Sequence, residues 1–103
     1  MTSKETVLLS DHAIDSFQKD GVVLLTDLFK PWVEGVQTAI EENKASPSWR
    51  ERTYRPDQGE GAEFFQDYCV WSNFRGYRAL VVESPMAEIA AKLMRSKTAR
   101  VFH

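Results

Sequence analysis

The first apolar positions of the chain follow helical spacing and then change to a continuous run. A cap, an apolar face and a helix stop occur in order at Ser10, Ala13, Ile14, Phe17 and Gly21. This order predicts a helix over residues 11–20. Residues 22–25 (Val-Val-Leu-Leu) are apolar at every position, which is typical of a short strand buried on both faces.

A second apolar face follows Pro31, a residue that is favoured at the first position of a helix. Its members recur at helical spacing and are Trp32, Val33, Val36, Ala39 and Ile40. We predict a helix from Pro31 to about Lys44, with a charged outer face. Periodicity then disappears from residue 45 to residue 63, where prolines and glycines interrupt a polar stretch. Because this connection is long for a compact domain, we expect a functional or mobile loop over 45–63.

The remaining positions predict two more helices and a strand. Residues 64–71 are rich in aromatic side chains, and periodicity does not decide between a strand and a packed extended segment. A polar pair at 72–73 is suited to cap a helix that ends at Ser84, and Ser84 with Pro85 is suited to begin the next helix. Residues 98–103 then predict a strand, one face of which would carry Ala99, Val101 and His103.

Short strands near 22–25 and 98–103 among several helices predict an α+β fold. A strand is stable only beside other strands, and this sequence encodes too few of them to complete a sheet. We therefore expect residues 1–103 to form a single incomplete domain, made of an N-terminal helical segment and the first core strand of a larger enzyme.

Composition and charge narrow the classes of protein and partner. The chain is 43% hydrophobic and 27% charged, as folded domains are. Its net charge of −2 does not favour nucleic acid or an anionic membrane as a partner. No apolar run approaches the roughly 20 residues of a membrane span, and the polar N-terminus does not resemble a signal peptide. Cys69 is the only cysteine, so no internal disulfide can form, and we expect a cytoplasmic protein.

The two histidines do not supply an iron site of the two-histidine, one-carboxylate type. Such a site usually has a histidine and an acidic residue two positions apart on a strand. Ile14 stands two positions after His12, and His103 is the last residue of the sequence given, so no H-x-D or H-x-E motif is encoded. We therefore assign no catalytic, cofactor-binding or metal-ligating residue. We interpret His12 as a solvated polar residue and His103 as a structural histidine, with a pocket-lining role as the alternative.

Three other features are candidates for chemistry. Arg50, Arg52 and Arg55 alternate with aromatic residues in the 45–63 loop, a combination that could contact a phosphate group, although a solvated loop is the simpler interpretation. Trp71 belongs to an aromatic run that is expected in the core, and it is our second candidate for lining a pocket. Cys69 has no histidine near it in sequence, so we interpret it as an inert buried thiol.

Both ends of the sequence resemble the phytanoyl-CoA dioxygenase family. The first part of the resemblance is Phe17-Gln18-Lys19-Asp20-Gly21, the apolar run 22–25 and a helix opened by Pro31. The second is Trp71-Ser72-Asn73, followed by the helix from Ser84-Pro85 and the segment 99–103. The resemblance covers most of residues 12–44 and 64–103 and leaves the loop unexplained.

The resemblance implies the N-terminal part of a double-stranded β-helix (jelly-roll) enzyme. Members of the family hold Fe(II) through an H-x-D motif and a distal histidine, use 2-oxoglutarate as co-substrate and hydroxylate small organic molecules. Fe(II) and 2-oxoglutarate are thus implied for a full-length member, and none is expected for this chain alone. Whether the chain is itself an enzyme stays open, because the catalytic motif is missing.

The alternative is a small non-catalytic interaction module. In this hypothesis, the chain pairs its C-terminal strand with a partner or with a second copy, because strand addition at an open edge is a recognised mode of binding. The partner of the full-length enzyme would instead be its small-molecule substrate.

Overall fold

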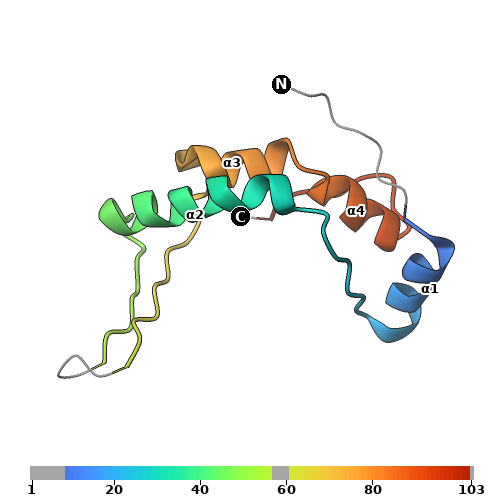
Figure 1. Ribbon diagram of the computed structural model, residues 1–103, viewed down its shortest axis with the longest axis horizontal. Helices are drawn as coiled ribbons and strands as arrows, with labels where there is room; N and C mark the ends of the chain where they lie inside the picture. Colours follow the sequence, from blue (N-terminus) through green and yellow to red (C-terminus); the bar gives the residue numbers. More distant parts are fainter. Residues whose placement is uncertain (1–8, 57–60, 103) are drawn as a thin grey trace.

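The computed structural model describes residues 9–56 and 61–102, and the regular structure within them is helical (Figure 1). Its elements are α1 (Asp11–Asp20), α2 (Lys30–Ala45), the short 3₁₀ helix η2 (Trp71–Asn73), α3 (Arg75–Val82) and α4 (Met86–Leu93). None of the helices in the described ranges is long and apolar enough to cross a membrane.

The predicted helix 11–20 is confirmed as α1, together with both of its terminal signals. The Ser10 hydroxyl accepts a hydrogen bond from the Ala13 N–H at 3.0 Å, which satisfies one of the free N–H groups of the first turn. Gly21 ends the helix at a φ of 76°, and its N–H donates to the Phe17 carbonyl at 2.8 Å. Local sequence is therefore sufficient to place this helix.

The predicted strands near 22–25 and 98–103, and with them the α+β and jelly-roll fold class, are wrong for this structure. Within the described residues there is no sheet, and the one β-bridge joins Tyr54 to Phe64 elsewhere in the chain. Apolar residues in an extended run become a strand only where a neighbouring strand offers N–H and C=O groups. Here Val22 is 69% exposed and Leu24 is 85% exposed, so the run is not buried on both faces as predicted. His103 lies outside the described residues.

Helices α2 and α3 form the main packed pair and lie side by side in Figure 1. Their backbones approach most closely at two glycines. A Cβ atom on Gly76 would lie 1.9 Å from the Gly35 carbonyl oxygen and 3.0 Å from the Ala39 Cβ. Only a residue without a side chain fits at this crossing, which brings Ala39 to 0% exposure.

Helices α1 and α4 form a second, smaller contact. The Gln18 side-chain amide donates to the Leu93 carbonyl at 2.7 Å, and Arg95 pairs with Asp15 at 2.5 Å. Among the described residues, the buried hydrophobic side chains are Ala39, Val70, Ile89 and Ala91. The Cα radius of gyration is 16.6 Å, compared with about 13 Å for a compact domain of this size. The molecule is therefore elongated around a small core.

A segment that we call the arm, residues 46–56 and 61–70, leaves the C-terminal end of α2, projects from the helices and returns to η2 (Figure 1). Its two sides are held together by backbone hydrogen bonds. Tyr54 and Phe64 exchange both of their N–H to carbonyl bonds at 2.8 Å, and the Arg52 N–H donates to the Gln66 carbonyl at 2.9 Å. The expected loop thus has paired sides where the structure describes it, and its mobility stays a prediction.

Candidate functional site

The candidate site begins at Asn43, a polar residue on the apolar face of α2. Asn43 follows Val36 and Ala39 at the spacing of that face and is 2% exposed. A buried amide needs hydrogen-bond partners, because leaving it without them costs free energy. Its Nδ2 group donates to Asp67 Oδ2 at 3.0 Å, and its Oδ1 atom accepts from the Tyr77 hydroxyl at 3.1 Å. The side chain thus joins the arm to α3.

Asp67 is the centre of this group of hydrogen bonds. Besides Asn43, it accepts from the Ser48 N–H at 2.7 Å, from the Tyr68 N–H at 2.9 Å and from the Ser48 hydroxyl. These donors come from the first side of the arm, the second side of the arm and α2. One carboxylate therefore holds the base of the arm closed and fixes it to the helix.

The pKa of Asp67 lies below its usual value. Burial raises the pKa, but the hydrogen bonds from Ser48, Asn43 and Tyr68 together lower it by more. Tyr77 shows the opposite shift, since burial and the nearby charge of Asp67 both raise the pKa of its hydroxyl. At neutral pH the carboxylate is thus ionised and the tyrosine is protonated.

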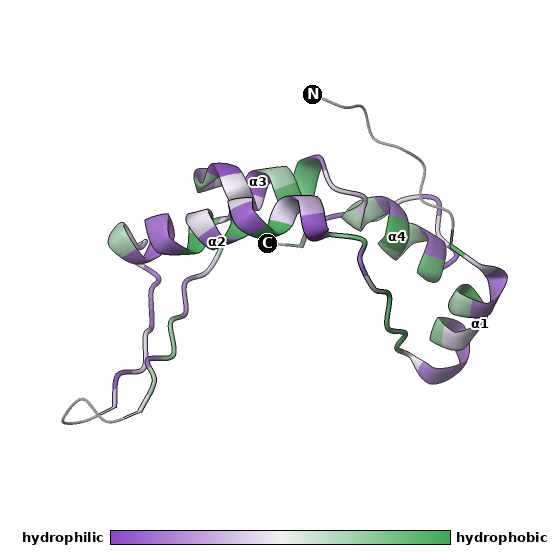
Figure 2. Ribbon diagram, in the orientation of Figure 1, coloured by the Kyte–Doolittle hydropathy of each residue, from purple (hydrophilic) through white to green (hydrophobic). Residues whose placement is uncertain are grey.

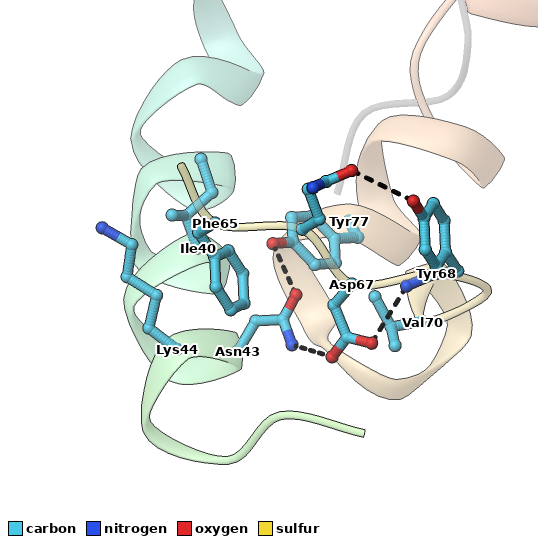
Figure 3. A pocket seen from close by; sticks show the side chains of 9 residues that line it. Ile40, Asn43, Lys44, Phe65, Asp67, Tyr68, Val70 and Tyr77 are labelled. Carbon is cyan, nitrogen blue, oxygen red and sulfur yellow. Dashed lines mark hydrogen bonds between the residues drawn. The ribbon is translucent and has the colours of Figure 1, made fainter. Parts of the chain in front are cut away.

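These residues border an open pocket of about 480 Å³ between α2, α3 and the arm (Figure 3). Apolar side chains form much of its wall, and Lys44 stands at the side away from Asp67 (Figure 3). The lining residues are Ile40, Asn43, Lys44, Phe65, Gln66, Asp67, Tyr68, Val70 and Tyr77. A concave apolar surface with a few convergent polar groups is the usual form of a ligand site.

The chemistry of the pocket is better suited to fixing the arm on α2 and to binding a ligand than to proton transfer in catalysis. A general acid or base is most effective with a pKa near the working pH, whereas both shifts here move the groups away from neutrality. The polar atoms of Asn43, Asp67 and Tyr77 also bond to one another rather than pointing together at an open position. Within the described ranges, no group of three or more His, Cys, Asp or Glu side chains could hold a metal ion.

The structure does not bring the three candidate arginines together at one point. The Arg50 guanidinium donates to the Tyr68 carbonyl at 2.9 Å and to the Cys69 carbonyl at 3.2 Å, and it lies 5.0 Å from the centre of the Trp49 ring. Arg52 donates to the carbonyl of Glu51 at 2.8 Å. Arg55 forms ion pairs with Glu63 at 3.3 Å and with Glu51 at 3.8 Å. Phosphate contact by these residues stays a prediction.

The two candidates for lining a pocket are placed differently. Trp71 is half-buried in η2 and is not among the residues around the Asp67 pocket. His103 lies outside the described residues. A substrate role for either residue stays a prediction.

Sequence reasoning missed the residues that do converge, Asn43, Asp67 and Tyr77. One signal was present, because an asparagine at an apolar-face position of a helix indicates a buried amide with a specific partner. The identity of that partner was not readable, since Asp67 and Tyr77 are 24 and 34 positions away.

Comparisons with known proteins found no match to a family model, a curated protein or a solved structure.

Proposed function

We propose that residues 1–103 form an N-terminal helical part of a non-haem Fe(II)/2-oxoglutarate-dependent oxygenase that hydroxylates a small organic substrate. The sequence resemblance to the phytanoyl-CoA dioxygenase family motivates the proposal. Its physical support is an apolar surface that this chain leaves uncovered. The role of the helices would be to brace a catalytic core formed by other residues.

The observation that carries the proposal is the exposure of the run 22–25. Val22 and Leu24 are 69% and 85% exposed, whereas the alternate residues Val23 and Leu25 are half-buried. One side of this extended segment therefore rests on the molecule, and the other offers two large aliphatic side chains to water. Burying such a side chain gains roughly 1.5–3 kcal/mol, so a covering surface would stabilise the protein. A catalytic core docked on this side would supply that cover.

A groove nearby offers further apolar surface for the same core. It has a volume of about 350 Å³ and lies between α2 and the facing ends of α3 and α4. Its walls are Phe29, Trp32, Val33, Val36, Gln37, Leu80 and Met86. Figure 2 shows the apolar colouring of the segment 22–25 that leads into this end of α2.

The residues of this chain do not fit the iron site that the family uses. The sequence has no H-x-D or H-x-E motif, and the described residues contain no cluster suited to a metal. Under the proposal, iron and 2-oxoglutarate are therefore held by residues outside 1–103. The cytoplasm is the proposed location, supported by a single cysteine, which leaves no internal disulfide.

The first test is to read the coding DNA beyond the codon for His103. The proposal expects an in-frame H-x-D motif followed by a distal histidine. A stop codon directly after His103 would overturn it, and the interaction module would become the leading hypothesis.

The second test uses the longer protein and its 2-oxoglutarate turnover, measured as succinate release. Leu24→Asp is expected to lower the melting temperature of the longer protein by several degrees and to reduce its turnover, because it places a charge in the proposed interface. The same change in residues 1–103 alone should leave stability nearly unchanged. Ala87→Asp, which introduces the same charge at an exposed position of α4, is the matched control and should affect neither quantity. Equal melting temperatures for Leu24→Asp and the unaltered longer protein would refute the bracing role.

A further inference from the structure

The arm separates its side chains into two faces of different chemistry. Directly opposed residues of an antiparallel pair point to the same side, and successive residues alternate between sides. The Tyr54–Phe64 bridge and the Arg52–Gln66 bond set the register. One face therefore carries the opposed pairs Glu51/Asp67, Thr53/Phe65 and Arg55/Glu63. The other, which we call the aromatic–arginine face, carries Arg52, Tyr54, Phe64 and Gln66, and Tyr68 adjoins it through its hydrogen bond to Gln66.

Exposure distinguishes the aromatic side chains of the two faces. Around the base of the arm, Thr53, Phe65 and Asp67 are half-buried. On the aromatic–arginine face, Tyr54 and Phe64 are each 63% exposed, and the adjoining Tyr68 is 51% exposed. Large rings held in water at a projecting position are the residue types that carry most of the binding energy in protein interfaces.

Hydrogen bonds hold this face in one arrangement. The Gln66 side chain donates to the Arg52 carbonyl at 3.0 Å and accepts from the Tyr68 hydroxyl at 3.0 Å. Arg50 is tied to the carbonyls of Tyr68 and Cys69. Little side-chain freedom is then left to lose on binding, which favours affinity.

The charge of the face selects the partner. Arg52 lies on it, Arg50 stands beside it at the carbonyls of Tyr68 and Cys69, and Glu51, Glu63 and Asp67 lie on the other face. Two arginines are too few for a nucleic-acid surface, especially on a chain of net charge −2. A protein surface with carboxylates beside small or apolar side chains is the complementary partner.

Helix α2 of a second copy has this chemistry. Between Lys30 and Lys44, it carries Glu34, Glu41 and Glu42 and no basic residue, and these glutamates are exposed. Glu34 and Glu41 are seven positions apart and share a face with the small, exposed residue Thr38 between them. A two-fold arrangement would place the arm of each copy on α2 of the other and use both surfaces twice.

We propose that this protein forms a two-fold homodimer in which the aromatic–arginine face of each arm docks on the acidic face of α2, around Glu34 and Glu41, in the second copy. The dimer uses neither the exposed run 22–25 nor the C-terminal segment. It therefore stands independently of the proposed oxygenase.

The experiment measures the dimer dissociation constant by analytical ultracentrifugation over a concentration series at low and high salt. We expect a reversible dimer that weakens as salt rises, because charges across the interface are screened. Arg52→Glu and the double variant Glu34→Arg/Glu41→Arg should each weaken the dimer at least tenfold. Lys97→Glu, an exposed charge reversal outside both surfaces, is the matched control and should leave the dissociation constant unchanged.

Mixing the two variants provides the decisive result. In a mixed pair, the carboxylate that Arg52→Glu introduces in one copy meets the arginines introduced on α2 of the other copy. The unaltered Arg52 of that other copy meets unaltered glutamates, so both contacts regain complementary charge. We expect the mixture to dimerise although neither variant does so alone.

Three results would overturn the proposal. One is a protein that is monomeric throughout the concentration series, and another is a dimer that Arg52→Glu does not weaken. The third is failure of the mixture to dimerise, with each variant shown to be folded by its circular dichroism spectrum.

Discussion

At the scale of single residues, Asp67 is the side chain that fixes the base of the arm to α2. It accepts hydrogen bonds from α2 and from both sides of the arm, and four donors share its two oxygens. Hydrogen bonds to a charged acceptor contribute more than those between neutral groups. The carboxylate is thus the feature that makes the arm a defined part of the fold.

Replacement of this carboxylate should destabilise the protein. Asp67→Asn replaces one acceptor oxygen with an NH₂ group, which cannot accept hydrogen bonds from the donors around it. We therefore expect the free energy of unfolding to fall by about 1–3 kcal/mol. Urea unfolding followed by circular dichroism measures the change. Asp27→Asn is the control, because the Asp27 side chain is 69% exposed beside Lys30 and asparagine tolerates its φ of 65°. That control should change stability by less than about 0.5 kcal/mol.

The lowered pKa of Asp67 also predicts how stability depends on pH. The folded protein binds a proton at Asp67 less readily than the unfolded chain does, where the carboxyl pKa is about 4. The stabilising contribution is therefore complete above that value and is lost as pH falls through the folded-state pKa. We expect the stability difference between the unaltered protein and Asp67→Asn to be constant from pH 7 to pH 5 and to shrink at lower pH. A difference that persists undiminished at pH 2 would contradict the assignment.

At the scale of elements, the crossing of α2 and α3 depends on a single missing side chain. A Cβ on Gly76 would overlap the Gly35 carbonyl oxygen at 1.9 Å, whereas a Cβ on Gly35 would lie 3.8 Å from the Gly76 Cα atom, an ordinary contact. The two glycines face each other, but only one of them must be glycine for steric reasons.

This asymmetry predicts opposite effects for two alanine substitutions. Gly76→Ala should force the helices apart and destabilise the protein by about 1–3 kcal/mol, as overpacking does. Gly35→Ala should be neutral or stabilising by up to about 1 kcal/mol, since alanine favours a helix interior over glycine. Urea unfolding of both variants checks the pair. Equal losses would mean that the crossing is looser than the structure shows.

At the scale of the whole molecule, the hydrophobic core is not where the most hydrophobic run of aliphatic residues, 22–25, lies. Ile89 on α4 is 6% exposed, whereas Leu24 in the run 22–25 is 85% exposed. Stability therefore depends on α4 and its neighbours more than on the most hydrophobic stretch of sequence.

Two truncations to alanine should show where the core lies. Ile89→Ala is expected to lower the free energy of unfolding by about 2–4 kcal/mol, the range for a buried aliphatic side chain. Leu24→Ala should change it by less than about 0.5 kcal/mol, because little of its surface is buried. Thermal and urea unfolding of residues 1–103 compare them. A larger loss for Leu24→Ala would place the run 22–25 in the core after all.

Helix ends were readable from local sequence because their determinants lie within a few residues of one another. Ser10 caps Ala13, and Gly21 bonds to Phe17, so a short window contains both partners. The same holds for the helix opened by Pro31, which the structure extends to Lys30–Ala45. Helix α4 begins one residue later than predicted, with Pro85 rather than Ser84 in the cap position, although the Ser84 hydroxyl still accepts from the Met86 N–H at 3.2 Å.

The sequence does not show which side chains are buried or which of them come together at one site, because both depend on residues far apart in the chain. The run 22–25 has the composition of a buried strand, yet composition does not state whether a neighbouring strand exists. Nor does the sequence indicate that Asn43 meets Asp67 and Tyr77, or that Gly35 meets Gly76. Local sequence was thus enough for the approximate places of the helices, for the two caps of α1 and for the lack of an iron-binding motif, but not for the residues that begin α3 and α4. The all-helical fold, the paired arm and the Asp67 pocket required the tertiary structure, since only packing decides which surfaces are covered and which polar groups find partners.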